Sequence, residues 1–170
     1  MGDLFDSPKD AQEIATNTQN PLARILGFDG LPVKVFFVYG SPPHDPSPLE
    51  RTIFADTPLT TLGTCAVLDF GRTQIVAYHG HDMSEKGAIG HGWDRFVSKL
   101  SLERAWKRVA GVAESDWVIF GHTHLPGIDI KHRVANCGGW QPKGFLVRPA
   151  CTGLMLSTEN DSLEVVHFAR

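Results

Sequence analysis

Residues 118–126, VIFGHTHLP, combine an apolar run, a glycine and two histidines that are one residue apart. The apolar part belongs to residues 116–120, DWVIF, which predict a short buried strand. Gly121 then permits a tight turn, so that the imidazoles of His122 and His124 can lie on the same side. The stretch therefore predicts a strand that ends in a pair of histidines.

Two further apolar runs end in polar residues of the same kind. Residues 33–39, VKVFFVY, predict a strand buried on both faces, followed by the proline-rich loop GSPPHDPSPLE. Residues 63–78 predict two strands joined by a tight turn near Gly71 and Arg72, and the second strand leads directly into HGHDM. The carboxyl ends of strands in an open α/β sheet form its binding crevice, so we expect the three polar clusters to meet there. Five histidines would then lie together: His44, His79, His81, His122 and His124.

The rest of the chain predicts two helical regions and a β-rich tail. Residues 9–19 follow Pro8 and predict a helix, while residues 93–113 have the apolar spacing of one broken or two short amphipathic helices. Beyond residue 126, apolar and polar residues alternate, and the turn residues 159–161 predict a terminal hairpin. We expect one mixed α/β domain over residues 1–170 with an added antiparallel half.

Composition narrows the class of protein. The three cysteines, Cys65, Cys137 and Cys151, have no CxxC spacing, which argues against a zinc ribbon or a disulfide framework and favours a reducing compartment. A net charge of -3 disfavours bulk binding of nucleic acid. No apolar run approaches the roughly 20 residues that cross a bilayer. We expect a cytoplasmic protein without a membrane or nucleic-acid partner.

Histidine and carboxylate clusters at strand ends are typical of sites for borderline divalent ions. Neutral imidazole nitrogen and hard carboxylate oxygen together suit Zn, Mn, Fe, Co or Ni. The alternative for both GHTH and HGH is a polar turn whose histidines are solvated and bind nothing.

The order of these motifs resembles that of a known enzyme family. GHTHLP is followed by NCGGWQPKG at residues 136–144, with HGHD upstream and GDLFD at residues 2–6. Over nearly its whole length the chain resembles the calcineurin-like metallophosphoesterases, especially the small bacterial and archaeal phosphodiesterases. The resemblance implies an αββα sandwich of two mixed sheets flanked by helices. It also implies hydrolysis of a small phosphodiester or phosphomonoester by metal-activated water, with one or two ions of Mn, Ni, Fe or Zn.

The same resemblance assigns four metal ligands. Asp3 would be the carboxylate that bridges two ions, His79 and His122 would bind one ion, and His124 the other. Two ions roughly 3.5–4 Å apart activate the nucleophile and neutralise the phosphate charge. The alternative for Asp3 is a solvated carboxylate near the chain end.

Five further residues take roles around the metals. His44 matches the histidine that stabilises or protonates the leaving oxygen, with Asp45 as its orienting carboxylate; the alternative is a surface histidine in a proline-rich loop. His81 is expected to contact phosphate. Ser41 stands where the family has a metal-binding asparagine; its neutral hydroxyl is a poor ligand, so we assign it to the substrate. Asn136 is expected to brace the GHTH loop through side-chain hydrogen bonds.

Two departures from the family pattern keep rival hypotheses open. The family's D-x-H motif would stand before MGDLFD, so we expect a protein without that opening strand and its ligands; in addition, the prolines Pro42 and Pro43 stand before His44. The first hypothesis is the enzyme. The second is a scaffold or binding protein that keeps the fold without hydrolysis, like the retromer scaffold subunit. The third is an N-terminally truncated enzyme, or one completed by another chain, for which we expect a homo-oligomer or a rearranged sheet edge.

Overall fold

The computed structural model describes residues 9, 34–41, 44–45, 59–81, 99–139, 150–157, 159–160 and 162–168. The chain forms two compact units, Met1–Cys65 and Ala66–Arg170. The helix predicted for residues 9–19 lies outside the described residues, except for Lys9.

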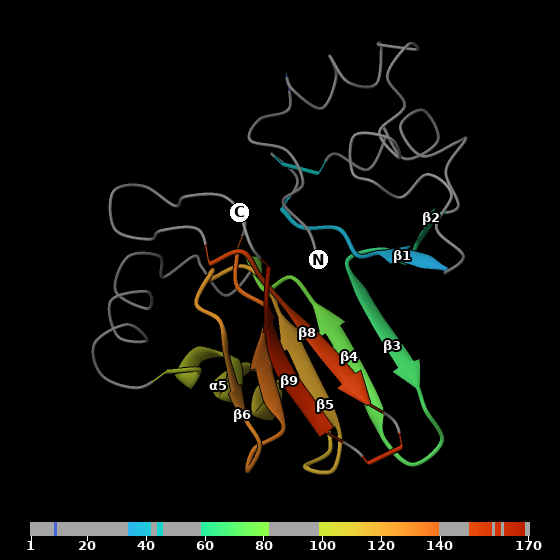
Figure 1. Ribbon diagram of the computed structural model, residues 1–170, viewed down its shortest axis with the longest axis vertical. Coiled ribbons are helices and arrows are strands. Elements are labelled where there is room, and N and C mark those ends of the chain that lie inside the picture. Colours follow the sequence, from blue (N-terminus) through green and yellow to red (C-terminus); the bar gives the residue numbers. More distant parts are fainter. Residues whose placement is uncertain are drawn as a thin grey trace. The chain divides into compact units, whose positions relative to one another are not determined.

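The first unit contains a two-stranded parallel sheet (Figure 1). In it, β1 (Val35–Phe37) pairs with β2 (Leu59–Thr61). The prediction that residues 33–39 are buried on both faces is wrong at Phe36, which is 52% exposed. A strand is buried on both faces when layers cover both sides of its sheet, and β1 lies in a small sheet with one face open at this position. The strand β2 was not predicted.

The second unit is built on a five-stranded mixed sheet. Its strands β4, β5 and β7 are parallel, and β6 runs antiparallel to β7. The strand order is β3 (Cys65–Asp69), β4 (Gln74–Tyr78), β5 (Trp117–Phe120), β7 (Val134–Asn136) and β6 (Gly127–Asp129). The strands predicted within residues 63–78 and 116–120 are therefore confirmed.

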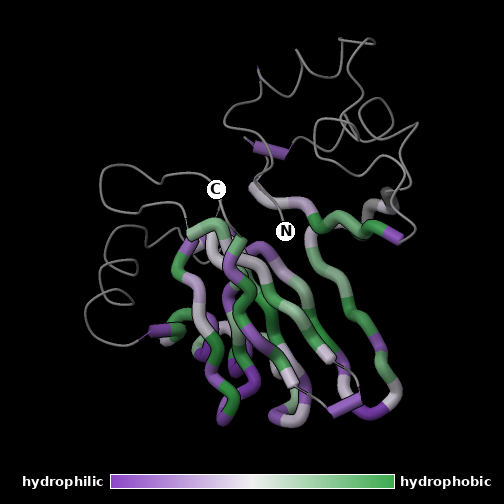
Figure 2. The backbone as a smooth tube through the Cα atoms, viewed as in Figure 1, coloured by the Kyte–Doolittle hydropathy of each residue, from purple (hydrophilic) through white to green (hydrophobic). Residues whose placement is uncertain are grey.

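A tight turn joins β3 to β4, as predicted. The N–H of Phe70 donates to the carbonyl of Thr73 at 3.1 Å, and Asp69 Oδ1 accepts the N–H of Gly71 at 2.7 Å. Gly71 has φ 81°, in the left-handed region that glycine adopts at little cost. Figure 2 shows hydrophilic residues at this turn and hydrophobic residues within the strands.

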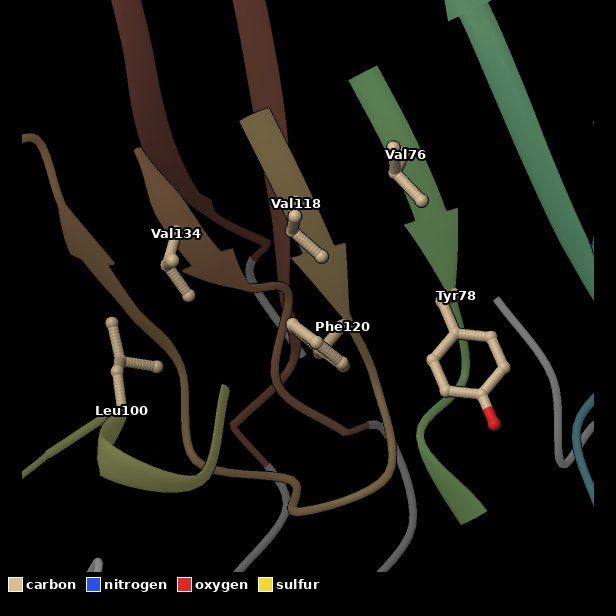
Figure 3. Packing of buried hydrophobic residues seen from close by; sticks show 6 residues of the cluster. All are labelled: Val76, Tyr78, Leu100, Val118, Phe120 and Val134. Atoms are coloured by element: carbon tan, nitrogen blue, oxygen red, sulfur yellow. The ribbon is translucent and has the colours of Figure 1, made fainter. Parts of the chain in front are cut away.

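One face of the five-stranded sheet is covered by a helix. The helix α5 (Ser101–Val109) follows Leu100, whose side chain joins the cluster in Figure 3. On the strands this cluster is formed by alternate residues, as the two-residue period of a strand requires. Trp106 of α5 packs against it, with its ring stacked on Tyr78 at 4.6 Å between centroids. The cluster consists of Val76, Tyr78, Leu100, Val118, Phe120 and Val134.

The other face of the sheet packs against a C-terminal hairpin. The strands β8 (Thr152–Ser157) and β9 (Ser162–His167) pair antiparallel, as predicted. The buried residues between the two sheets are Ile75, Trp117, Ala135 and Leu163. Helix, mixed sheet and hairpin thus form three successive layers. The mixed α/β fold is confirmed, and these three layers are part of the expected αββα sandwich.

The amphipathic pattern at residues 93–113 is confirmed in its second half by α5, while residues 93–98 lie outside the described part. No helix within the described ranges is long and apolar enough to cross a membrane.

Candidate functional site

The parallel pairing of β4 and β5 brings two distant histidines together. Ala77 of β4 lies opposite Ile119 of β5, so the two strands end at the same edge of the sheet. His79 Nε2 lies 3.0 Å from His122 Nδ1, although the residues are 43 positions apart in the sequence. Their ring centroids are 5.0 Å apart, and the ring planes meet at 74°. The two side chains therefore lie next to each other, as predicted.

The backbone holds the two loops in this arrangement. We call residues 121–124 the histidine turn. The carbonyl of His79 accepts the N–H of His122 at 2.9 Å, and the N–H of His124 donates to the carbonyl of Gly121 at 3.1 Å. Gly80 has φ 98°, and a Cβ there would lie 3.1 Å from a ring atom of Phe120. The first loop therefore requires glycine next to His79.

His81 belongs to the same group of rings. Its ring centroid is 6.1 Å from that of His79 and 6.3 Å from that of Tyr78. His79 is buried at 1% exposure, while His81 and His122 are partly accessible. The site thus has a buried histidine at its base and two histidines that a ligand could reach.

His124 packs against Gly139, the second glycine of the NCGGW motif. It has φ 59°, a left-handed conformation that is uncommon outside glycine. Its ring packs against Gly139 so closely that a Cβ on this glycine would lie 2.5 Å from His124 Cγ. Gly139 therefore lies directly against the imidazole ring of His124.

A buried polar network holds Thr123, the residue between the two histidines of the turn. Glu103 Oε1 accepts the hydroxyl of Thr123 at 3.0 Å and the side-chain N–H of Asn136 at 3.0 Å. Asn136 also donates to Thr123 Oγ1 at 2.8 Å. Its Oδ1 accepts the N–H of Gly138 at 2.9 Å. Asn136 thus contacts the histidine turn through its side chain, in the way that the sequence led us to expect.

Glu103 was not identified from the sequence, although a signal was present. It lies three residues after Leu100 and three before Trp106, both of which pack into the core beside α5. An acidic residue on the apolar face of an amphipathic helix is rarely buried without a partner. Its 2% exposure shows that this position faces the protein interior.

Cys137, which follows Asn136, has the character of a core residue. Burial raises the pKa of its thiol, and this effect is larger than the opposing electrostatic and hydrogen-bond effects. A raised pKa makes the reactive thiolate scarcer near neutral pH. The Cys137 Sγ instead donates to the carbonyl of Gly138 at 3.6 Å.

The residues His44, Asp45 and Ser41 lie in the first unit, in the loop after β1. The carbonyl of Ser41 accepts the N–H groups of His44 and Asp45, both at 2.9 Å. Asp45 is 4% exposed, and its Oδ2 accepts the N–H of Gly40 at 2.8 Å. Because β1 pairs with β2 and not with the five-stranded sheet, the convergence of His44 with the other histidines stays a prediction. Asp3 lies outside the described residues.

The donor geometry of His79 and His122 fits a shared metal ion. Two nitrogens at about 2.0–2.1 Å from one ion lie about 2.8–3.0 Å apart at a 90° angle, and about 3.3–3.4 Å at a tetrahedral angle. The observed 3.0 Å between His79 Nε2 and His122 Nδ1 matches the first value, and it also suits a hydrogen bond between the rings. Within the ranges that the structure describes, no three His, Cys, Asp or Glu side chains are grouped to hold a metal.

Comparisons with known proteins yield structural neighbours only. No family model matches the chain, and no curated protein matches it. A conserved protein of Streptococcus pneumoniae described as a predicted phosphoesterase is 15% identical over 98% of this chain and 86% of its own, with a TM-score of 0.42. An archaeal phosphodiesterase is 20% identical over 84% of this chain and 73% of its own, with a TM-score of 0.45. A mutant of Vps29 from Entamoeba histolytica is 12% identical over 88% of this chain and 90% of its own, with a TM-score of 0.47.

These neighbours are proteins of the metallophosphoesterase fold. At these identities and TM-scores they say nothing about the activity of this chain.

Proposed function

We propose that this protein is a metal-dependent phosphoesterase that hydrolyses a small phosphodiester or phosphomonoester with metal-activated water. The observation that carries the proposal is the 3.0 Å approach of His79 Nε2 to His122 Nδ1 at the carboxyl ends of two adjacent parallel strands. Each of these histidines belongs to a motif of the family that the sequence resembles, HGHD and GHTH.

His79 and His122 would hold one divalent ion, and Asp3 and His124 would complete the metal site. The bound ion lowers the pKa of water and neutralises phosphate charge. Manganese, nickel, iron and zinc all accept imidazole together with carboxylate, so the proposal covers these four ions. His81 would contact the phosphate, as its accessible ring beside His79 allows.

The proposal also assigns roles to three residues of the first unit, His44, Asp45 and Ser41. His44 would protonate or stabilise the leaving oxygen, Asp45 would orient it, and Ser41 would contact the substrate. For Asp45, its burial and its hydrogen bond to the Gly40 N–H support at least a role in holding the loop. We further propose a cytoplasmic protein of one functional domain, without a membrane or bulk nucleic-acid partner, that forms a homo-oligomer.

The second candidate is a binding protein of the same fold that does not hydrolyse phosphoesters. It is favoured by Ser41, which stands where the family resemblance calls for a metal-binding asparagine. Such a protein would keep the histidine turn as a structural element or as a weak metal site.

Variants at His122 distinguish the two candidates. For the enzyme, His122→Ala should remove bound metal and hydrolysis together, since one ligand of the ion is lost. The matched control is His167→Ala, which replaces an exposed histidine at the end of β9. Equal metal content and equal turnover in the wild type and His122→Ala would rule out the proposed site.

A further inference from the structure

A buried carboxyl group on α5 is attached to the histidine turn. Glu103 is 2% exposed on a helix whose neighbouring face packs into the apolar core. Burying a polar group costs free energy unless hydrogen bonds replace those it made to water. Glu103 obtains such bonds from Thr123, in the loop after β5, and from Asn136, the last residue of β7.

The three side chains form a closed set of hydrogen bonds. Glu103 accepts from both partners through one oxygen, and Asn136 also donates to Thr123. Each of the three is therefore held by the other two, which restricts the rotation of the Thr123 side chain more than one bond would. Asn136 is fully buried and Thr123 is 8% exposed, so little water competes for these bonds.

Thr123 lies between the two histidines that the proposed function uses. The backbone of the turn is already fixed at His122 by the carbonyl of His79 and at His124 by the carbonyl of Gly121. The side-chain bonds of Thr123 add an attachment at the middle residue. A change in this attachment would turn the peptide planes on both sides of Thr123, and with them the directions of the two imidazoles.

We propose that Glu103 is a positioning residue of the histidine turn: through Thr123 it fixes the directions in which His122 and His124 present their ring nitrogens. The part of this proposal that concerns metal affinity rests on the proposed function. The part that concerns imidazole geometry holds for the metal-free protein as well.

The same helix supplies a matched control. Lys107 lies one turn after Glu103 and is also buried, at 6% exposure. Its Nζ donates to the carbonyls of Asp116 at 2.6 Å, His132 at 2.8 Å and Glu114 at 3.3 Å. These carbonyls lie outside the histidine turn. A variant at Lys107 therefore loosens α5 without touching the attachment of Thr123.

The test compares Glu103→Leu, Glu103→Gln and Lys107→Met in the full chain. The first readout is the set of imidazole ¹⁵N chemical shifts of His122 and His124, measured by NMR without metal at one pH. The second is the affinity for Ni²⁺ by calorimetry, at a temperature where circular dichroism shows each variant to be folded. The free energy of unfolding is measured alongside, because a merely structural role would change it alone.

We expect Glu103→Leu to shift the imidazole signals and to weaken Ni²⁺ binding by about 10- to 100-fold, as loss of a residue that orients a ligand typically does. Glu103→Gln should retain wild-type values, since its Oε1 can accept both hydrogen bonds. Lys107→Met should lower stability and leave both readouts unchanged. Imidazole shifts in Glu103→Leu that equal those of the wild type would overturn the proposal.

A second pair of variants covers the case in which Glu103→Leu does not fold. Thr123→Val keeps the shape of threonine without its hydroxyl, and Thr123→Ser keeps the hydroxyl. The proposal requires shifted imidazole signals in Thr123→Val and wild-type signals in Thr123→Ser, and equal signals in both would refute it. If the wild type binds no Ni²⁺ or other divalent ion, the proposed function fails while the imidazole readout still decides the role of Glu103.

Discussion

Glu103 and Lys107, one turn apart on α5, attach the helix to opposite ends of β5. Glu103 bonds to Thr123, three residues after the last residue of the strand, and Lys107 bonds to the carbonyl of Asp116, which directly precedes it. The helix is thereby fixed lengthwise against the strand that carries the histidine turn. Apolar packing alone, being non-directional, would specify this position less strictly.

The first prediction concerns the contribution of Lys107 to stability. Lys107→Met removes the donor of three backbone carbonyls, and unsatisfied buried groups cost about 1–3 kcal/mol. We expect a decrease of this size in the free energy of unfolding, measured by urea titration. Lys131→Met, at an exposed position in the β6–β7 turn, should change it by less than about 0.5 kcal/mol. A Lys107→Met protein as stable as the wild type would refute this role.

The second prediction concerns the pH dependence that Lys107 confers. Desolvation by burial lowers the pKa of its ammonium group below 10.5, and the charges of Asp116, Arg133 and Glu114 modify this shift less. Between the folded pKa and 10.5 the unfolded chain binds more protons, so stability from this group rises with pH in that window. Replacing Lys107 by Met should therefore reduce the increase of the free energy of unfolding with pH, as urea titrations from pH 8 to pH 10 would show. An identical slope for wild type and variant would contradict it.

The third prediction concerns acid stability and Asp129. Burial raises the pKa of this carboxyl, but hydrogen bonds from His132 and Arg104 outweigh it, so the pKa is lowered below 3.8. The ion pair of Arg104 with Asp129 is 2.9 Å long, and that of His132 is 2.8 Å long. Between the folded pKa and 3.8 the unfolded chain binds more protons, so this contribution is present above 3.8 and is lost as the pH falls through the folded pKa.

Asp129→Asn should therefore reduce the loss of stability on acidification from pH 5 to pH 3. At pH 7 the variant should cost less than about 1 kcal/mol, since the contacts of Asp129 with Arg104 and His132 are partly exposed. Urea titrations at each pH measure the effect, with Glu164→Gln on the exposed side of β9 as the control. An acid transition that Asp129→Asn leaves unchanged would count against these hydrogen bonds.

The fourth prediction concerns the wall beside His124. Gly139→Ala places a methyl group where the His124 ring now lies, so the ring must move. Such overpacking costs about 1–3 kcal/mol, and the imidazole signals of His124 should shift in NMR spectra. Gly127→Ala is the matched control, because its Cβ would meet the nearest atom, of Leu100, at 3.6 Å. Unchanged His124 signals in Gly139→Ala would show that the His124 ring does not pack against this position and would contradict the prediction.

The part of the fold that the sequence predicts is the part set by local pattern. Buried parallel strands are continuous apolar runs, so β4 and β5 are visible in the sequence, and their histidines meet because parallel neighbours end at the same edge. β2 has the sequence LTT, which is too short and polar to stand out. Its pairing with β1 is a tertiary contact that no local pattern encodes.

The residues of the candidate site also fall into two groups, those that local sequence predicts and those that only the folded chain reveals. His79 and His122 follow apolar runs directly or within two residues, and motif spacing is sufficient to select them as candidates. Glu103 lies on α5. The apolar spacing of this helix predicts which of its faces is buried, but it does not predict which residues that face contacts. Its contacts with Thr123 and Asn136 depend on the packing of α5 over the sheet, which only the folded chain defines.

The most direct test of the proposed function is one titration of the purified 170-residue chain with Mn²⁺, Ni²⁺, Zn²⁺ or Mg²⁺, following hydrolysis of bis(p-nitrophenyl) phosphate and bound metal together. We expect turnover to appear as one or two ions bind per chain with at least one of the metals other than Mg²⁺, and we expect His122→Ala to abolish both metal binding and turnover. Metal binding without turnover would favour the binding protein. Neither binding nor turnover in a folded chain would contradict the assignment of His79 and His122 as metal ligands.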